Sequence, residues 1–303
     1  MRTLLQHLLR AACAALVLGC SREPAPAPRL DGPPRRLVPT TVAAAELLSL
    51  VAGPEDVLAL PEQVDDYSAQ DFQSGGWEKL PRFAHYVAEP LLVLRPGLVV
   101  NHRWQAAETT ALLQSKGVPV LTLESGVTWN EVRQSLLDLG RALQREERAR
   151  AALAALDERV EALALRRRAG DKATALVYSN DGSGDSAAGS HTTADTIVQL
   201  AGLSNAAAAA GIEGHVELGF ERLLLLDPDL IVTAAQARGE SGSATRRVIE
   251  STPALAGLRA RREGRLVELP AALLSSDSQH IVDAAERLQA EAARVLGVRD
   301  GPR

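Results

Sequence analysis

Aromatic side chains and cysteine are scarce in this sequence of 303 residues, and the chain lacks an excess of positive charge. Phe, Trp and Tyr together make up 3% of the chain, and Cys13 and Cys20 are its only cysteines. The formal net charge is −5 at pH 7, whereas a nucleic-acid-binding surface needs an excess of Lys and Arg. We therefore expect no nucleic-acid partner.

Catalytic, nucleotide-binding and zinc motifs are missing as well. The sequence has no Gly-x-Ser-x-Gly nucleophile motif, and Ser186 and His191 have no evident third partner for a catalytic triad. The glycine-rich stretch at residues 181–191 lacks the Gly-Lys-Ser/Thr ending of a phosphate-binding loop. We expect no catalytic residue and no enzyme, with a periplasmic hydrolase as the weaker alternative. The following histidines lack the close spacing of a structural zinc site: His85, His102, His191, His215 and His280.

The N-terminus has the features of an export signal. Arg2 and Arg10 form a positively charged start, and a short apolar run follows that ends in Leu-Val-Leu-Gly-Cys at Cys20. This ending resembles a bacterial lipobox, which implies removal of residues 1–19 and a lipid on Cys20. Cys13 would leave with the signal, so the mature chain can form no internal disulfide. We expect a lipid-anchored protein at the periplasmic or cell-surface face of a bacterial membrane; a plain secretory signal or an uncleaved anchor is the alternative.

The remaining chain divides into a spacer, two lobes and a connector. Residues 20–36 are rich in proline and have no periodic apolar positions, as expected of an extended tether. Short apolar strands then alternate with amphipathic helices, which indicates α/β lobes with mostly parallel central sheets. We expect two pseudo-symmetric lobes at residues 37–128 and 171–303. The expected strands are residues 37–38, 57–60, 98–101, 118–123, 173–179, 230–234 and 265–269; the expected helices are residues 41–51, 105–116, 192–201, 245–250 and 278–296, and residues 61–87 and 180–191 are expected loops.

A long helical pattern at residues 129–170 is the expected connector between the lobes. Thr128 and Glu131 form a capping box at its start. A weak break is expected at Gly140, with a restart at Glu146, and the second part alone is long enough to span a small domain. One apolar stripe runs along this part: Ala149, Leu153, Leu156, Val160 and Leu163.

An internal repeat indicates that both lobes have the same plan. The segments EPLLVLRPGLVV, from Glu89, and ERLLLLDPDLIV, from Glu221, share a glutamate, a leucine-rich turn, a proline and an apolar strand in the same register. The offset between them is 132 residues, 221 − 89. In each copy the proline ends a short helix, and the strand after it is apolar because both of its faces are covered.

Several segments, taken together, resemble one family. They are LVPTTVAAAELLSLVAGPEDVLAL, EPLLVLRPGLVV, SKGVPVLTL, AGLSNAAAAAGIEGHVELGFERLLLLDPDLIV and GRLVELP. With the connector, they resemble the periplasmic solute-binding proteins of ABC importers for cobalamin, ferric siderophores and haem, the helical-backbone metal-receptor type. The family usually has glycine where this chain has Ala84, and aspartate where it has Gly97.

The resemblance implies two lobes joined by one long rigid helix, with the ligand held between them. It further implies a substrate-binding component that delivers a metal chelate to a permease and ATPase complex. Glu89 and Glu221 match the family's paired glutamates, which are inferred to meet arginines on the two permease subunits. The chain is expected to be a monomer with no cofactor besides its transport ligand. A lipid-anchored haem or metal-binding protein without an importer is the alternative function.

The few aromatic residues concentrate in one region. A flat or greasy ligand would use large flat side chains on a loop, although packing within the loop would account for two or three of them. Tyr67 also falls where cobalamin-binding members carry a tyrosine. Six of the nine lie within residues 67–104: Tyr67, Phe72, Trp77, Phe83, Tyr86 and Trp104.

Polar residues after two expected strands complete the candidate site, because ligands of parallel α/β lobes bind beyond the carboxyl ends of strands. His102, Arg103 and Trp104 follow one strand, and the loop that ends at His191 follows another. Arg103 could neutralise a propionate, phosphate or siderophore carboxylate. His191 is the best candidate for an axial ligand to iron or cobalt, and no other metal ligand is expected. The expected ligand-binding residues are Tyr67, Trp77, Tyr86, His102, Arg103, Trp104 and His191.

Overall fold

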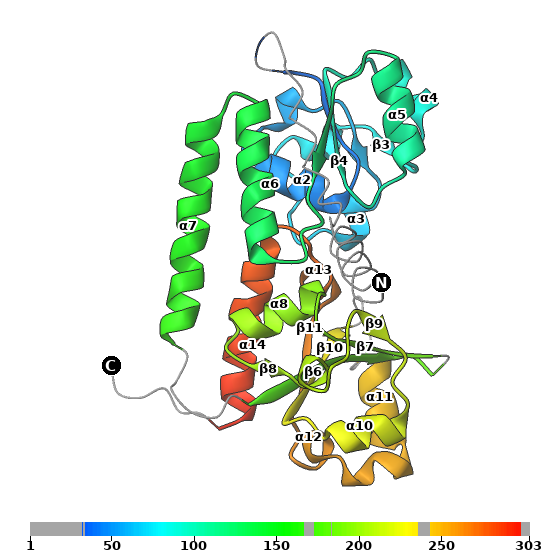
Figure 1. The fold of residues 1–303 in the computed structure, drawn as a ribbon, viewed down its shortest axis with the longest axis vertical. Coiled ribbons are helices and arrows are strands. Elements are labelled where there is room, and N and C mark those ends of the chain that lie inside the picture. The colour runs from blue at the N-terminus through cyan, green and yellow to red at the C-terminus, as the bar shows by residue number, and fades with distance from the viewer. Residues whose placement is uncertain (1–31, 33, 167–172, 183, 236–242, 298–303) are drawn as a thin grey trace, which may run out of the picture.

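The computed structural model describes residue 32 and residues 34–166, 173–182, 184–235 and 243–297. It has two α/β lobes, one above the other, with a pair of helices along one side (Figure 1). The expected signal peptide, Cys20 and most of the tether lie outside the described residues. Within the described ranges, none of the helices has the length and apolar character needed to cross a membrane.

The N-terminal lobe is built on a parallel sheet with the strand order β1-β4-β5. Its strands are β1 (Leu37–Pro39), β4 (Leu98–His102) and β5 (Val120–Leu123). Every residue of β4 is buried, because helices cover both faces of the sheet. The helices are α2 (Val42–Ser49) on one face, and α4 (Ala88–Val93) and α5 (Ala107–Ser115) on the other.

The segment between β1 and α4 is more structured than the loop expected at residues 61–87. Arg82 organises it by donating hydrogen bonds to Asp65 at 2.9 Å and to the backbone oxygens of Trp77 and Leu80 at 3.1 and 2.8 Å. The helical turns and strands of this segment are each too short to show a periodic pattern in the sequence. They are the 3₁₀ turn η1 (Pro54–Asp56), β2 (Leu60–Pro61), α3 (Val64–Tyr67), the 3₁₀ turn η2 (Trp77–Lys79) and β3 (Arg82–Phe83), and β2 pairs with β3.

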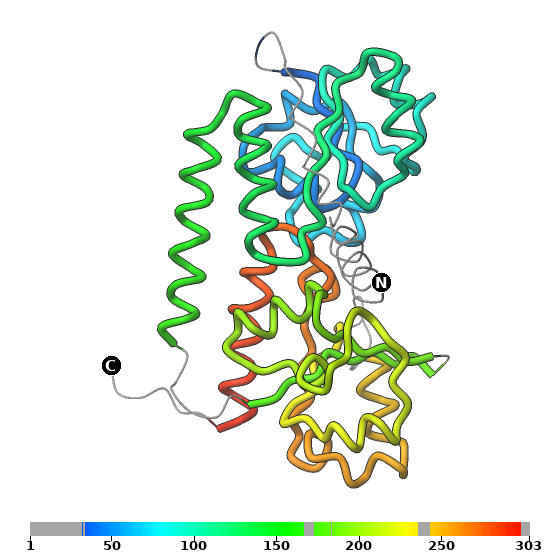
Figure 2. The backbone as a smooth tube through the Cα atoms, in the orientation of Figure 1, coloured from blue at the N-terminus to red at the C-terminus, as the bar shows by residue number. Residues whose placement is uncertain are grey.

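The connector is a hairpin of α6 (Trp129–Ala142) and α7 (Glu146–Leu165), of which α7 is the long helix that runs from one lobe to the other (Figures 1 and 2). The expected capping box is confirmed, since Thr128 and Glu131 each accept the other's backbone N–H. The turn passes through Gln144 at a φ of 54°, and the helix restarts at Glu146 as expected.

Gly140 does not end α6 but lets the two helices of the hairpin approach each other. A Cβ at Gly140 would lie 2.5 Å from the Cβ of Ala149, so a larger residue would push α7 away. Asp157 then links the helices lower down, accepting from Trp129 Nε1 at 3.2 Å and pairing with Arg133 at 3.1 Å. The residues after 166 that were expected to extend the connector lie outside the described ranges.

The C-terminal lobe has a larger mixed sheet in the order β11-β10-β6-β7-β9, with β8 beside β6. The pairs around β10 and β6 are parallel, whereas β7 is antiparallel to both β6 and β9. The region expected to be a Gly/Ser loop, residues 180–191, is therefore a β-hairpin in part, because β7 pairs back onto β6. The strands are β6 (Thr174–Asn180), β7 (Asp185–Ala188), β8 (Ser204–Asn205), β9 (His215–Val216), β10 (Leu230–Ala235) and β11 (Leu266–Pro270).

Helices pack on both faces of this sheet. One face carries α8 (Thr193–Leu200) and α14 (His280–Val295), which join the core of the N-terminal lobe. The elements of the other face are α9 (Ala206–Ala209), α10 (Phe220–Leu226), α11 (Ala244–Ser251), the 3₁₀ turn η3 (Pro253–Gly257) and α12 (Arg259–Arg262). Helix α13 (Ala271–Leu274) follows β11 and leads toward the boundary between the lobes.

The sequence repeat corresponds to the same structural unit in both lobes. In each copy a short helix, α4 or α10, is followed within two residues by a residue with positive φ, then by proline and a buried strand. The φ angles are 50° at Arg95 and 34° at Asp227, which are equivalent positions. Gly97 replaces the aspartate found in the second copy because a Cβ there would lie 2.2 Å from the backbone oxygen of Arg35.

The two lobes share one hydrophobic core. A single buried cluster includes Leu48 of α2, Leu136 of α6, Leu156 of α7 and Leu288 of α14. Polar contacts reinforce it, because Arg159 of α7 pairs with Asp283 and, at 2.6 Å, with Glu286, both on α14. This continuous packing favours small movements between the lobes over large ones.

Candidate functional site

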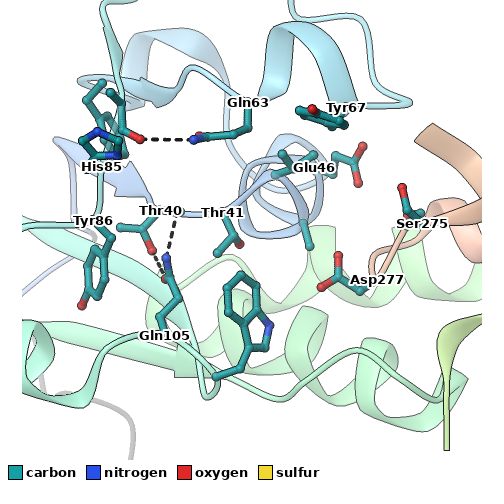
Figure 3. Close-up of a pocket in the computed structure, with 16 residues that line it drawn as sticks. Thr40, Thr41, Glu46, Gln63, Tyr67, His85, Tyr86, Gln105, Ser275 and Asp277 are labelled. Carbon is teal, nitrogen blue, oxygen red and sulfur yellow. Dashed lines mark hydrogen bonds between the residues drawn. The ribbon is translucent and has the colours of Figure 1, made fainter. Parts of the chain in front are cut away.

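A cavity of about 510 Å³ lies at the boundary between the lobes (Figure 3). The start of α2 and the segments around α3, β3 and the end of β4 form most of its wall, and residues after α13 close it from the C-terminal lobe. Its volume lies within the range of about 300–1,000 Å³ that is usual for small-molecule sites. The lining residues are Thr40, Thr41, Val42, Ala43, Glu46, Gln63, Tyr67, Phe83, Ala84, His85, Tyr86, Trp104, Gln105, Ser275, Ser276 and Asp277.

Four of the six clustered aromatic residues line the cavity: Tyr67, Phe83, Tyr86 and Trp104. Tyr67 and Trp104 are each 60% exposed, which leaves much of each ring accessible to a ligand. Phe72 and Trp77 instead pack edge to face inside the lobe, with ring centroids 5.3 Å apart. Trp77 is therefore a core residue rather than part of the cavity wall, as the packing alternative anticipated for a minority of the six.

Tyr86 is held in place by a small polar network behind the cavity. Its hydroxyl contacts Thr110 Oγ1 at 2.9 Å and accepts from Asn101 Nδ2 at 3.1 Å. Asn101 belongs to the buried strand β4 and Thr110 to α5, so two rigid elements fix the ring.

His102 supports the cavity wall from behind. It is the last residue of β4, is 1% exposed, and its Nδ1 lies 2.8 Å from Thr41 Oγ1. Burial lowers the pKa of His102 to about 4, so its ring is neutral at pH 7. The ring stacks on Trp104 with centroids 6.0 Å apart, which places His102 beneath a lining residue and not in the lining itself.

Two carboxyl groups are the main charged feature of the wall, and sequence reasoning missed both. Glu46 of α2 accepts from Ser68 Oγ at 2.7 Å and from the Ala69 N–H at 2.8 Å. Burial, together with a smaller effect of the nearby negative charge of Glu46, raises the pKa of Asp277 to about 6. In Figure 3 the two side chains lie on the same side of the cavity. The sequence pattern does mark Glu46 as unusual, because it is an acid among the buried apolar residues of α2.

Arg103 and His191, like Trp77 and His102, lie outside the cavity lining, so four of the seven expected ligand-binding residues do not line it. Arg103 is exposed and pairs with Glu124 at 2.6 Å. His191 is also exposed, at a φ of 58°. His85 is the histidine that lines the cavity, together with Gln63, whose Nε2 donates to the Ala84 oxygen at 3.1 Å. Among the described residues, no group of three or more His, Cys, Asp or Glu is placed to hold a metal ion.

The paired glutamates lie outside the cavity, on the first turns of α4 and α10. Both are exposed. Figure 1 shows α4 in one lobe and α10 in the other, both on the side of the molecule away from α7.

Comparisons with known structures give the same bilobed fold. Periplasmic heme-binding protein BhuT, in complex with two hemes, is 23% identical, with 86% of this chain and 99% of that chain covered and a TM-score of 0.72. Heme-binding protein HutB of Vibrio cholerae is 22% identical, with 84% and 98% covered and a TM-score of 0.72. Vitamin B12 binding protein BtuF of Vibrio cholerae is 16% identical, with 87% and 98% covered and a TM-score of 0.69.

The family comparison covers most of the chain. No curated protein matches it in a sequence search. A family model described as periplasmic binding protein matches residues 62–273, a span that contains both copies of the repeat and half of the residues that line the cavity. On this match, the chain belongs to the periplasmic binding protein family.

Proposed function

We propose that this chain is the substrate-binding component of an ABC importer, and that it captures a metal chelate between its lobes and delivers it to the permease. The observation that carries this proposal is the combination of an interlobe cavity with two exposed glutamates in matching register, Glu89 and Glu221. A pseudo-symmetric pair of acids suits docking onto a two-fold symmetric partner. A store without an importer would have no use for that pair.

The charge of the cavity favours a particular kind of ligand. The described lining residues include Glu46 and Asp277 but no Lys or Arg. A ligand with carboxylate groups would meet negative charge there without a cation to offset it. A neutral or cationic ligand that offers N–H donors fits these carboxyl groups better.

We infer a corrinoid such as cobalamin as the first candidate, before ferric siderophores and then haem. Corrinoids present amide side chains to their surroundings, whereas haem carries two propionates. Tyr67 and Trp104 provide apolar faces for a broad macrocycle. The similar structures are described as haem-binding and vitamin B12-binding proteins, so both ligand types lie within the range of this fold. His85 replaces His191 as the candidate axial ligand, because it lines the cavity.

A titration series followed by absorption and fluorescence tests the ligand. The mature protein is mixed separately with cyanocobalamin, haemin and a neutral ferric hydroxamate, and quenching of Trp fluorescence reports binding. We expect saturable, one-to-one binding of cyanocobalamin. Tighter binding of haemin would overturn the choice of ligand, and no binding of any of the three would overturn the proposed function.

We also propose that the mature chain is a monomer, tethered through Cys20 to a bacterial membrane at its periplasmic or cell-surface face. The lipobox-like ending at Cys20 supports this tether. In cell fractionation, a Cys20→Ser variant should move from the membrane to the soluble fraction. Unchanged retention in the membrane would place the anchor elsewhere.

A further inference from the structure

Two helices outside the cavity expose a large apolar side chain to solvent. Val93 of α4 is 80% exposed and Leu225 of α10 is 85% exposed. Among the large apolar residues of the described chain, only Leu165, at 86%, is as exposed as these two. Single exposed apolar residues are common on protein surfaces, so exposure alone would not require an explanation.

The positions of Val93 and Leu225 are related by the internal repeat. Their separation is 132 residues, 225 − 93, the same offset that relates Glu89 to Glu221. Each lies four residues after its glutamate, and residues four apart lie on the same face of a helix. Each lobe therefore presents a carboxylate and, one turn away, an exposed apolar side chain.

Packing within each lobe does not require these two side chains. Leu91 of α4 is 1% exposed and Leu223 of α10 is fully buried, and these two residues are also 132 apart. They anchor their helices in separate clusters of the two lobes. Leu91 and Leu223 thus anchor the buried faces of α4 and α10. The exposed apolar side chains at positions 93 and 225 are not needed to hold the two helices against their lobes.

We propose that Val93 and Leu225 are apolar docking contacts, each inserted beside the cationic site that receives the neighbouring glutamate on one of two equivalent membrane subunits. This inference rests on the proposed function. The glutamates would supply orientation and a fast encounter, because exposed ion pairs contribute little binding free energy. Burial of the two apolar side chains would supply the slow dissociation, as is usual for the central contacts of an interface.

The partner surface follows from this arrangement. It has two copies of the same site, related by a two-fold axis, and each copy combines an Arg or Lys with an adjoining apolar depression. Leu225 is larger than Val93, so the two depressions are filled to different extents. The homologous permease subunits of an importer have the required symmetry.

The test compares two variants that remove the same kind of side chain from opposite sides of the molecule. One carries Val93→Ser and Leu225→Ser. The matched control carries Leu165→Ser, on α7. Each mature protein is added to nanodiscs that contain the reconstituted importer, and binding is measured by surface plasmon resonance. Thermal unfolding and cyanocobalamin titration check that the fold and the cavity are intact.

We expect the Val93/Leu225 variant to bind the importer at least about tenfold more weakly, mainly through faster dissociation, whereas the Leu165 variant binds like wild type. A Glu89→Lys and Glu221→Lys variant distinguishes failure of the apolar inference from failure of the proposed function. If it loses importer binding while the Val93/Leu225 variant does not, the apolar inference is wrong and the proposed function stands. If neither variant is affected, both the docking face and the proposed role fail.

A site-specific crosslink gives an independent measurement. A photoreactive phenylalanine analogue is placed at position 93, 225 or 165 of the full-length chain in living cells. We expect positions 93 and 225 to crosslink to a permease subunit, identified by mass spectrometry, and position 165 not to do so. Crosslinks from 93 and 225 to any other protein, or none at all, would contradict the proposal.

Discussion

The carboxylate of Glu46 accepts a hydrogen bond of 2.5 Å from the hydroxyl of Ser278, although the two residues are 232 positions apart. Glu46 lies on α2 of the N-terminal lobe and Ser278 lies just before α14 of the C-terminal lobe. Gln279 adds a second link, since its Nε2 donates to the Glu46 backbone oxygen at 3.1 Å. The wall of the cavity is thus also a joint between the lobes.

Loss of this joint should destabilise the whole molecule. We expect Glu46→Ala to lower the free energy of unfolding by about 2–4 kcal/mol, because Ser68, Ala69 and Ser278 all lose a buried acceptor. Glu62→Ala, at an exposed acid of the same lobe, should change it by less than about 0.5 kcal/mol. Urea denaturation of both variants measures the difference, and equal stabilities would contradict the role of Glu46.

Asp277 should make stability depend on pH in a defined direction. Its pKa rises from 3.8 in the unfolded chain to about 6 in the native protein, so the native state binds the proton more tightly. Its contribution is most favourable below pH 4 and is lost as the pH rises through 6. Relative to wild type, Asp277→Asn should therefore gain about 1–2 kcal/mol between pH 4 and pH 7, an estimate reduced for partial exposure. A pH-independent difference between the two proteins would show that Asp277 is not perturbed.

His102 should have the opposite effect on the pH dependence of stability, over a similar pH range. Its pKa falls from 6.5 in the unfolded chain to about 4 in the native protein, so the unfolded state takes up the proton first as the solution is acidified. Stability is fully present above pH 6.5 and falls by at most about 3 kcal/mol as the pH approaches 4. In His102→Gln this loss should disappear, which denaturation midpoints at pH 7 and pH 4.5 would reveal. An identical acid loss in wild type and variant would exclude His102 as its source.

Two tryptophans of the aromatic region should respond differently to mutation. Trp104→Ala removes an exposed lining residue and should weaken cyanocobalamin binding by about 1–3 kcal/mol, with little effect on stability. Trp77→Ala removes a core residue and should lower the free energy of unfolding by about 3–5 kcal/mol. Calorimetric titration and urea denaturation of both variants test this separation. The assignment fails if Trp77→Ala, while still folded, loses more affinity than Trp104→Ala.

Local patterns predicted the framework of this fold well. The capping box at Thr128 and Glu131, the apolar stripe that begins at Ala149, and the repeat that starts at Glu89 and Glu221 are all short-range signals, and the structure confirms each of them. Strand β7 was missed because its four residues, Asp185–Ala188, are small or polar and gain their pairing from β6.

The cavity wall was harder to predict because distant segments form it. Asp277 faces Glu46 only after the C-terminal lobe has folded against α2, and no local pattern connects the two. Trp77 and Trp104 lie in the same aromatic stretch. Trp77 packs against Phe72 in the core, whereas Trp104 lies at the surface. The aromatic stretch of the sequence forms part of the cavity wall, and tertiary packing decides which of its residues line the cavity.

The proposed role of this chain is to deliver its ligand to an importer through contacts made by Glu89 and Glu221. The most direct measurement is ATPase stimulation of the reconstituted importer by a variant with both glutamates changed to lysine. Its control carries Glu147→Lys and Glu158→Lys, two exposed acids on α7 whose replacement changes the net charge equally. We expect stimulation by the Glu89/Glu221 variant to collapse, because each lysine meets a cationic site, while cyanocobalamin affinity and the control variant stay at wild-type levels. Normal stimulation by the Glu89/Glu221 variant would rule out docking to the importer through these two glutamates.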